Sequence, residues 1–237
     1  QKLKKKKVKK LKYYKKIIQV LLKIQKIKDK KIKNFNKNYY KIPLYTKKLL
    51  LKETNLFFDW YVPSVFKNKK VSYINRNLKK KIYLLLKKIK QSNDTFVHRD
   101  FHVSNIMINK NELSLLDNQD ALIGNKAYDL ASLVDDVRIK TSKKLKDEVY
   151  NYFLKLNTNR INEKNFKNDF DILSVLRNMK IIGIFTRLAI RDKKKFYLKL
   201  IPHAWNLIIF RLANNIIFNN LKDFLEINFP KKIRARK

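Results

Sequence analysis

Three polar residues between positions 100 and 117 have the types and spacing that phosphoryl transfer requires. His98, Arg99 and Asp100 form one tripeptide, Asn105 comes five residues after Asp100, and Asp117 comes twelve residues after Asn105. In phosphoryl transfer a protein mainly positions the reactants and neutralises charge. Asp100 would orient the attacking hydroxyl, and the amide of Asn105 and the carboxylate of Asp117 would hold magnesium on nucleotide phosphates.

The segments around these residues indicate how they are positioned. Residues 96–97 predict a strand, and residues 98–105 predict the polar loop that follows it, called the catalytic loop below. Residues 106–108 and 113–116 predict a hairpin with a polar turn, and Asp117 ends its second strand. This order of strand, polar loop, hairpin and carboxylate is that of a kinase catalytic region.

A plainer alternative gives the loop no chemistry, with His98 capping a backbone carbonyl and Asp100 and Asn105 forming turns. In the catalytic interpretation, His98 is a hydrogen-bond partner that fixes the loop, and His102 is a candidate to face substrate. His203 is expected at the surface or in packing. The three histidines show no pair at helical spacing and no adjacent carboxylate pattern, so they do not predict a zinc site.

Polar residues downstream of the hairpin are further candidates. Gln119 and Asp120 offer the donor and acceptor groups that sugars need, or they are satisfied within their own loop. Asp129, at the start of a predicted helix, would stabilise the N–H groups there or anchor the catalytic loop from beneath. Asp135 and Asp136 are predicted to form a solvated helix end.

The composition indicates a folded protein with an ordinary core. The chain has 237 residues, of which 45% are hydrophobic, enough for one or two domains. It has no cysteine, which fits a reducing compartment. Its wholly apolar runs are too short to span a bilayer. We therefore expect a cytoplasmic protein without a transmembrane segment.

The formal charge of +39 permits binding to nucleic acid or to an anionic membrane. However, lysine greatly outnumbers arginine and accompanies Asn, Ile, Phe and Tyr in every segment, the pattern that A/T-rich codons produce. We therefore expect ordinary solvated lysine surfaces and no specific nucleic-acid partner. Residues 1–10 are mostly lysine and lack the long apolar centre of a signal peptide. We expect them to be a basic linker or hinge remnant.

Apolar residues at spacings of three and four predict that most of the chain is helical. Residues 29–41, rich in Lys and Asn, are predicted to be a loop. The aromatic cluster at 57–61 is expected to pack in the core, with sugar stacking as the alternative. The fold class is therefore mainly α with a small β-hairpin. The predicted helices cover 11–24, a segment from about 46 that Pro63 interrupts, 71–89, 128–137 and several segments after 145.

Several segments resemble the aminoglycoside phosphotransferase superfamily, small-molecule kinases with a protein-kinase-like fold. HRDFHVSN, LSLLDNQDA and YDLASL look like its catalytic region. NLFFDWYV at 55–62 and LRNMKIIGIFTRLAIRD at 176–192, with YLKLIPHAW downstream, are similar to the bacterial anomeric kinases for N-acetylmuramate and N-acetylglucosamine in cell-wall recycling. The likeness covers essentially residues 11–210.

The resemblance implies a fold and cofactors. Residues 11–237 would form the large C-terminal lobe of a protein-kinase-like fold, with a helical substrate subdomain at about 127–229. The cofactors would be ATP and Mg²⁺, and the small-molecule substrate an amino sugar. Asp100 would be the catalytic residue, with Asn105 and Asp117 as magnesium ligands. Asn118 departs from the family pattern, because an aromatic residue usually packs behind the metal-binding aspartate.

A second departure is the lack of a recognisable phosphate-covering lobe. Such kinases have a small β-rich lobe with a phosphate-covering loop and a lysine that pairs with the phosphates. Here the first glycine is Gly124, and residues 1–50 predict helices where strands are expected. We therefore expect that the N-terminal lobe lies outside this sequence, is supplied by a separate chain or has been lost, and that residues 1–237 alone have no appreciable kinase activity. The alternative is a kinase-derived, non-catalytic protein that binds nucleic acid or anionic lipid through its basic surface.

Overall fold

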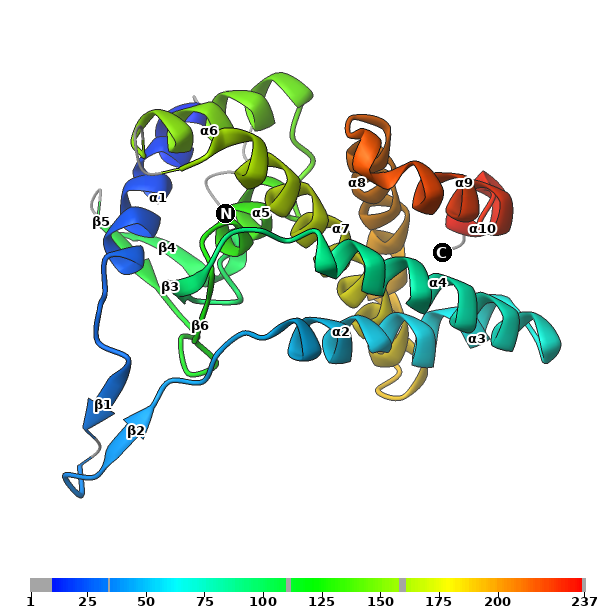
Figure 1. Cartoon of the computed structure of the whole chain (residues 1–237), viewed down its shortest axis with the longest axis horizontal. Helices are drawn as coiled ribbons and strands as arrows, with labels where there is room; N and C mark the ends of the chain where they lie inside the picture. Colours follow the sequence, from blue (N-terminus) through cyan, green and yellow to red (C-terminus); the bar gives the residue numbers. More distant parts are fainter. Residues whose placement is uncertain (1–9, 34, 110–111, 158–160, 236–237) are drawn as a thin grey trace. The chain divides into compact units, whose positions relative to one another are not determined.

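The computed structural model consists mainly of helices, with a few short strands (Figure 1). The prediction of a mainly α protein with a small β-hairpin is therefore confirmed in its helical content, and the described residues form further strand pairs besides that hairpin. The described residues divide into two compact units: unit 1 draws on 1–46 and 90–170, and unit 2 on 47–89 and 171–237. Within the described part of the chain, no helix is long and apolar enough to cross a membrane. The structure describes residues 10–33, 35–109, 112–157 and 161–235.

Unit 1 contains the strands and the predicted catalytic loop. Its first helix confirms the predicted amphipathic pattern, because Tyr14, Ile17, Ile18 and Leu21 are buried on one face. The predicted basic linker lies outside the described residues except for Lys10. The elements of unit 1 are α1 (Lys10–Gln25), β1 (Lys31–Lys33), β2 (Tyr39–Lys41), β3 (Asn93–Val97), β4 (Ile106–Asn109), β5 (Glu112–Leu115), β6 (Leu122–Asn125), α5 (Ala127–Val134), α6 (Lys143–Lys155) and the start of α7 (Glu163–Ile190).

The described strands form three antiparallel pairs, β1–β2, β3–β6 and β4–β5. The predicted hairpin after the catalytic loop is confirmed as β4–β5, with Ile106 opposite Leu115. The middle of its turn lies outside the described residues. The prediction of a loop over 29–41 is wrong, because β1 and β2 pair there. These strands could not be recognised from the lysine- and asparagine-rich sequence, because it lacks the alternation of apolar and polar residues that marks a half-buried strand.

Unit 2 consists of helices, and its core confirms the packing role of the aromatic cluster. The indole N–H of Trp205 donates to the Tyr61 hydroxyl over 2.9 Å. Both rings lie about 6 Å or less from the Phe57 ring, and all three side chains are buried. The elements of unit 2 are α2 (Lys47–Leu56), a π-helical turn (Phe57–Tyr61), α3 (Val62–Val65), α4 (Lys69–Lys87), the remainder of α7, α8 (Ile201–Ala213), α9 (Asn219–Asn228) and α10 (Lys231–Arg234).

The helical path through Pro63 corrects the expectation that this residue interrupts the helix. Pro63 lies in the first turn of α3, directly after the π-helical turn, and the helix continues to Val65. Proline is tolerated in a first turn because the N–H that it lacks would have no helical partner there. The wider i→i+5 hydrogen bonding of the π-helical turn is seen in the bond from the Val62 N–H to the Phe57 carbonyl.

Gly183 on α7 lies directly against the backbone of Leu56 and Phe57. A Cβ atom at this position would overlap the carbonyl group of Leu56 and the backbone nitrogen of Phe57. We expect Gly183→Ala to lower the free energy of unfolding by about 3 kcal/mol, because a backbone cannot move aside as a side chain can. The measurement is denaturant unfolding followed by circular dichroism.

Gly124→Ala is the matched control for Gly183→Ala. The added Cβ would lie 3.0 Å from the Cβ of Tyr45 and 3.1 Å from the Cγ2 of Val97, which are side-chain atoms. A smaller loss is expected, because these groups can shift by a few tenths of an ångström. Equal losses for the two variants would show that the close approach at Gly183 does not constrain the fold.

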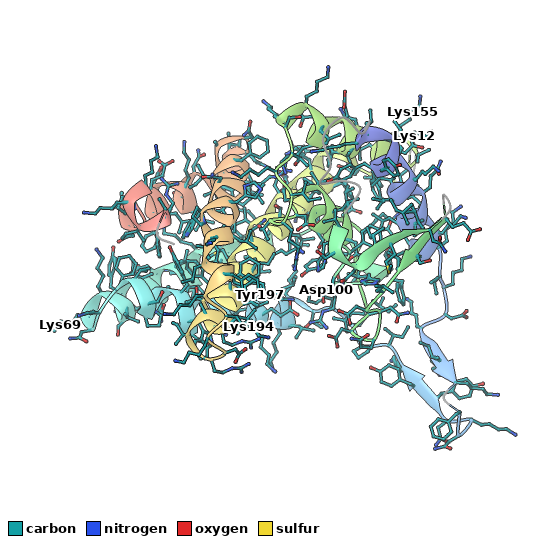
Figure 2. The ribbon with its side chains drawn as sticks, turned by 180° about the vertical axis from the view of Figure 1, so that it is seen from behind. Lys12, Lys69, Asp100, Lys155, Lys194 and Tyr197 are labelled. Atoms are coloured by element: carbon teal, nitrogen blue, oxygen red, sulfur yellow. The ribbon has the colours of Figure 1, made fainter. Side chains whose placement is uncertain are left out.

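Lysine side chains cover the outer faces of helices in both units. Figure 2 shows Lys12, Lys69 and Lys155 extending outward from α1, α4 and the end of α6. This distribution matches the expected solvated lysine surface, in which the long aliphatic stem lies along the protein and the ammonium group remains in water.

Candidate active site

The catalytic loop connects β3 to β4, and the β4–β5 hairpin brings its end back to Asp117. The Leu116 N–H donates to the Asn105 carbonyl over 2.9 Å, so Asp117 follows directly beside Asn105. The Asn105 Nδ2 donates to the Asp100 carbonyl over 3.1 Å. One hydrogen bond therefore links Asn105 to Asp100 within the loop, and the bond across the hairpin holds Leu116, the residue before Asp117, to Asn105.

Arg99 and Asp117 adopt left-handed backbone conformations, with φ of 70° and 69° respectively. This region costs a residue with a Cβ of the order of 1 kcal/mol or more, so surrounding contacts must maintain it. Both residues adjoin the proposed chemical groups, since Arg99 precedes Asp100 and Asp117 is itself a predicted ligand. The strained backbone therefore lies at Asp117 and directly before Asp100, the two carboxylates whose direction must be fixed.

The buried carboxylate of Asp129 holds the start of the catalytic loop. It accepts hydrogen bonds from the N–H groups of His98, over 2.7 Å, and Arg99, over 3.1 Å. Asp129 lies in the first turn of α5, a helix buried at all eight of its residues. Of the two roles considered from sequence, the structure shows the contact required for anchoring the loop. Hydrogen bonds to an ionised acceptor are stronger than those between neutral groups.

Asp136 holds the other part of the loop, and here the sequence prediction is wrong. Asp135 and Asp136, expected to be solvated, are both buried. Asp136 accepts the Val103 N–H over 3.1 Å and the Arg138 N–H over 3.0 Å. Asp135 instead pairs with Lys146 over 2.8 Å. The composition of α5 could have indicated this burial, because a helix that is apolar on all sides is buried and its end is buried with it.

A third buried carboxylate, Asp169 at the start of α7, supports the elements that carry the loop. Asp169 accepts the N–H groups of Lys90 and Gln91, which lead into β3, over 2.9 and 2.7 Å. It also accepts the Asn125 amide over 2.7 Å. The Asn125 Oδ1 in turn accepts the Ala127 N–H at the start of α5, over 2.9 Å. Sequence analysis missed Asp169, because its partners lie about 45 and 80 residues away in the chain.

The two loop histidines are both buried. Burial lowers the pKa of His98, while the charges of Asp100 and Asp117 and the carbonyl of Leu116 act in the opposite direction. His98 is therefore neutral at pH 7 and packs edge-on to Phe101, with ring centroids 6.1 Å apart. His102 is buried as well, and its role in facing substrate stays a prediction.

The exposed segment that follows Asp117 is fixed by its own contacts. The Gln119 amide donates to the Asp117 carboxylate. The Asp120 carbonyl accepts the Arg99 guanidinium over 3.0 Å, and that guanidinium lies 5.6 Å from the centre of the Tyr45 ring. The Gln119 side chain is thus bonded within its own loop, the second of the two roles considered for it, whereas Asp120 contacts Arg99 of the catalytic loop.

The oxygen atoms of Asn105 and Asp117 suit a magnesium ion. Because the Asn105 Nδ2 is committed to the Asp100 carbonyl, its Oδ1 is the atom that remains for a ligand role. The carboxylate of Asp117 is exposed. Mg²⁺ prefers oxygen ligands, commonly binds through one or two protein groups, and takes the remainder from phosphates and water. Among the described residues no group of three or more His, Cys, Asp or Glu could hold a metal, so these two ligands fit a nucleotide-bound metal and not a closed protein cage.

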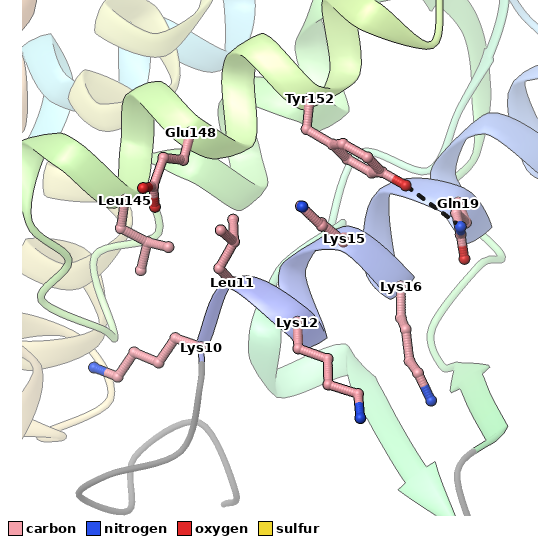
Figure 3. A pocket seen from close by; sticks show the side chains of 9 residues that line it. All are labelled: Lys10, Leu11, Lys12, Lys15, Lys16, Gln19, Leu145, Glu148 and Tyr152. Carbon is pink, nitrogen blue, oxygen red and sulfur yellow. Dashed lines mark hydrogen bonds between the residues drawn. The ribbon is translucent and has the colours of Figure 1, made fainter.

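Two hollows in the surface of unit 1 lie away from this loop. One, of about 860 Å³, is lined by α1 and α6, and Figure 3 shows lysines 10, 12, 15 and 16 along its α1 side. The Gln19 amide closes one end by donating to the Tyr152 hydroxyl over 3.4 Å. The other hollow, of about 1050 Å³, lies between the later part of α1, β5 and Lys126. Asp100, Asn105 and Asp117 line neither.

The segment that contains the catalytic loop, Asp129 and Asp136 is similar to known proteins. The sequence pattern of the phosphotransferase enzyme family matches residues 11–160. The chain belongs to this family. The spectinomycin phosphotransferase solved in complex with ADP and spectinomycin matches with a TM-score of 0.49 and 16% identity, over 94% of this chain and 66% of its own.

Relatives in the phosphotransferase family carry a more specific name. The N-acetylmuramate/N-acetylglucosamine kinase of Neisseria meningitidis serogroup B is 33% identical over 171 residues, which are 70% of this chain and 51% of the relative. The protein of the same name from Pseudomonas aeruginosa is 30% identical over 166 residues, 68% of this chain and 49% of the relative. The chain therefore spans about half the length of these two relatives.

Proposed function

We propose that this phosphotransferase-family chain carries the catalytic loop of an ATP- and magnesium-dependent small-molecule kinase. The observation that supports the proposal most strongly is that Asn105 donates to the Asp100 carbonyl within the loop, while the bond from the Leu116 N–H to the Asn105 carbonyl brings Asp117 beside it. Buried carboxylates hold that loop at His98, Arg99 and Val103. This is the large, metal-binding lobe of a kinase-like fold.

Each of the three residues has a distinct role in the proposed reaction. The Asp100 carboxylate accepts a hydrogen bond from the attacking hydroxyl and takes its proton as the hydroxyl oxygen bonds to the γ-phosphorus and ADP leaves. Asn105 and Asp117 would hold magnesium, which neutralises charge on the nucleotide phosphates. The chain's main contribution is positional, since the loop fixes these groups before substrate arrives.

The positioning role of Asp136 gives a testable consequence. In Asp136→Asn the Val103 N–H loses its charged acceptor, and a hydrogen bond to a charged group is worth about 1.5–3 kcal/mol. We expect kcat to fall about tenfold or more, because the loop is less well fixed, while ATP affinity changes little. Steady-state kinetics of folded protein, with the thermal midpoint as a parallel measurement, would test this.

Asp135→Asn is the matched control for Asp136→Asn. It removes a buried carboxylate one residue away, which pairs with Lys146 over 2.8 Å. It should lower the thermal midpoint and leave kcat per folded molecule nearly unchanged. Equal kcat values for the two variants would contradict a positioning role for Asp136.

For the acceptor, we propose the anomeric hydroxyl of an N-acetylated amino sugar. The proposal rests on the names of the two relatives and on the exposed donor and acceptor groups of Gln119 and Asp120 beside Asp117. A panel of N-acetylmuramate, N-acetylglucosamine, choline and an aminoglycoside, assayed for phosphate transfer from ATP, tests it. Preference for choline or the aminoglycoside would exclude the amino-sugar assignment and leave the kinase assignment intact.

For the nucleotide, we propose that the phosphate-covering lobe is supplied by polypeptide outside residues 1–237. The sequence offers no glycine before Gly124 from which a phosphate-covering loop could be built. Activity measurements therefore use the gene product together with any polypeptide encoded upstream of Gln1.

A further inference from the structure

The β1–β2 hairpin is a surface that the proposed reaction does not use. Figure 1 shows it extending away from α1, β3 and β6. Every residue of both strands is exposed, and the ladder is closed at its base by the Ile42 N–H, which donates to the Lys30 carbonyl over 2.9 Å. A two-stranded hairpin whose two faces are both exposed is only marginally stable in water. Burial of one face against a partner would therefore stabilise it.

One face of the hairpin is apolar, and its turn carries one exposed aromatic residue. Ile32 pairs directly with Tyr40 across the ladder, so both side chains lie on the same face. They are 52% and 56% exposed. Phe35, in the turn between the strands, is 94% exposed. Large apolar side chains gathered at one projecting point are uncommon on a soluble surface unless they mark an interaction site.

The opposite face of the hairpin is basic. The pairs Lys31–Lys41 and Lys33–Tyr39 alternate with the apolar pair, and the Lys33 ammonium lies 5.5 Å from the Tyr39 ring centre. The sequence from 26 to 41 contains seven lysines, one aspartate and no arginine. The complementary partner is therefore anionic, and a second copy of this chain, with a formal charge of +39, is disfavoured.

We propose that this hairpin docks on the interface of an anionic lipid bilayer. Ile32, Phe35 and Tyr40 would enter the boundary between headgroups and acyl chains, and the lysines on the other face would extend to the lipid phosphates. A single-stranded nucleic acid fits less well, because successive bases stack on several aromatic rings, and the basic face carries one ring, Tyr39, which already has the Lys33 ammonium 5.5 Å from its centre. The Ile32–Tyr40 pair instead shares its face with none of the three strand lysines. The proposal is independent of the catalytic function.

Vesicle flotation of the whole chain tests the docking surface. We expect binding to phosphatidylcholine vesicles that contain phosphatidylglycerol at about 0.15 M salt, where long-range attraction to the scattered lysines is largely screened. Replacing Phe35 and Tyr40 together by Ser should weaken this partitioning about tenfold or more. The matched control is Ile227→Ser on α9, whose side chain is 78% exposed, and it should bind as wild type.

A fluorescence measurement separates insertion from charge attraction. Phe35→Trp should give a blue-shifted emission component when anionic vesicles are added, and Ile227→Trp should give none. Wild-type partitioning by the Phe35/Tyr40 double variant, or no shift for Phe35→Trp, would overturn the proposal. So would a double variant that loses affinity for oligo-dT and keeps its affinity for vesicles, since the partner would then be nucleic acid.

Discussion

Asp100→Asn should lower kcat for phosphate transfer by about a thousandfold while folding and ATP affinity remain nearly unchanged. The substitution keeps the size of the side chain and removes the negative charge that orients the hydroxyl and accepts its proton. General base contributions of this kind are worth about 10²–10⁴ in rate. The neighbouring contacts should persist, because Asn105 bonds to the backbone carbonyl of Asp100 and not to its side chain.

The control for Asp100→Asn is Asp94→Asn on β3. Asp94 is exposed, and its carboxylate interacts locally with Ser92 and Thr95. Partial burial raises the pKa of Asp94, but the hydrogen bonds from Ser92 and Thr95 outweigh it and lower that pKa, so Asp94 is ionised at pH 7. Its substitution removes a charge from the same unit without touching the loop, so turnover should stay close to wild type. A similar fall in both variants would point to a general charge effect and not to a role for Asp100.

Asp117→Ala should weaken binding of ATP measured with magnesium by about a hundredfold. The substitution removes the charged ligand of the proposed metal, and a charge-assisted contact is worth about 1.5–3 kcal/mol. Isothermal titration with ATP in the presence and absence of magnesium measures the effect. The loss should disappear in the magnesium-free titration, because Asp117 acts on the phosphates through the metal.

Asp120→Ala provides the comparison for Asp117→Ala. Asp120 is exposed, and its carboxylate lies 4.0 Å from the Arg99 guanidinium. Its loss should leave magnesium-dependent ATP affinity unchanged, because exposed ion pairs contribute little. If Asp120 contacts the acceptor, the KM for the sugar should rise. Equal losses of ATP affinity in the two variants would contradict the assignment of Asp117 as the metal ligand.

The loop and its hairpin could be predicted from sequence because their determinants are local. The apolar residues of the two strands on either side of the polar turn predict the β4–β5 pairing, and the register of that pairing places Asn105 next to Asp117. The spacing of the three polar residues then carries the chemistry. The amphipathic helices were predictable for the same reason, since a period of 3.6 residues is visible in any short window.

The supports of the loop could not be predicted, because they depend on contacts between distant segments. Asp136 is a charged residue at a helix end, and only the packing of α5 shows that this end is buried. Asp169 meets β3 and β6 through the fold alone. The β1–β2 hairpin has no buried face to impose alternation, so its strands could not be recognised by pattern.

The central claim is that the Asp100 loop transfers a phosphoryl group to an amino sugar. The most direct measurement is phosphorus NMR of N-acetylglucosamine incubated with ATP, magnesium and the protein, with any polypeptide encoded upstream of Gln1 included. We predict a sugar 1-phosphate signal coupled to the anomeric proton, and none from Asp100→Asn. No transfer by the wild type, a phosphate on another hydroxyl, or the same signal from Asp100→Asn would contradict the account.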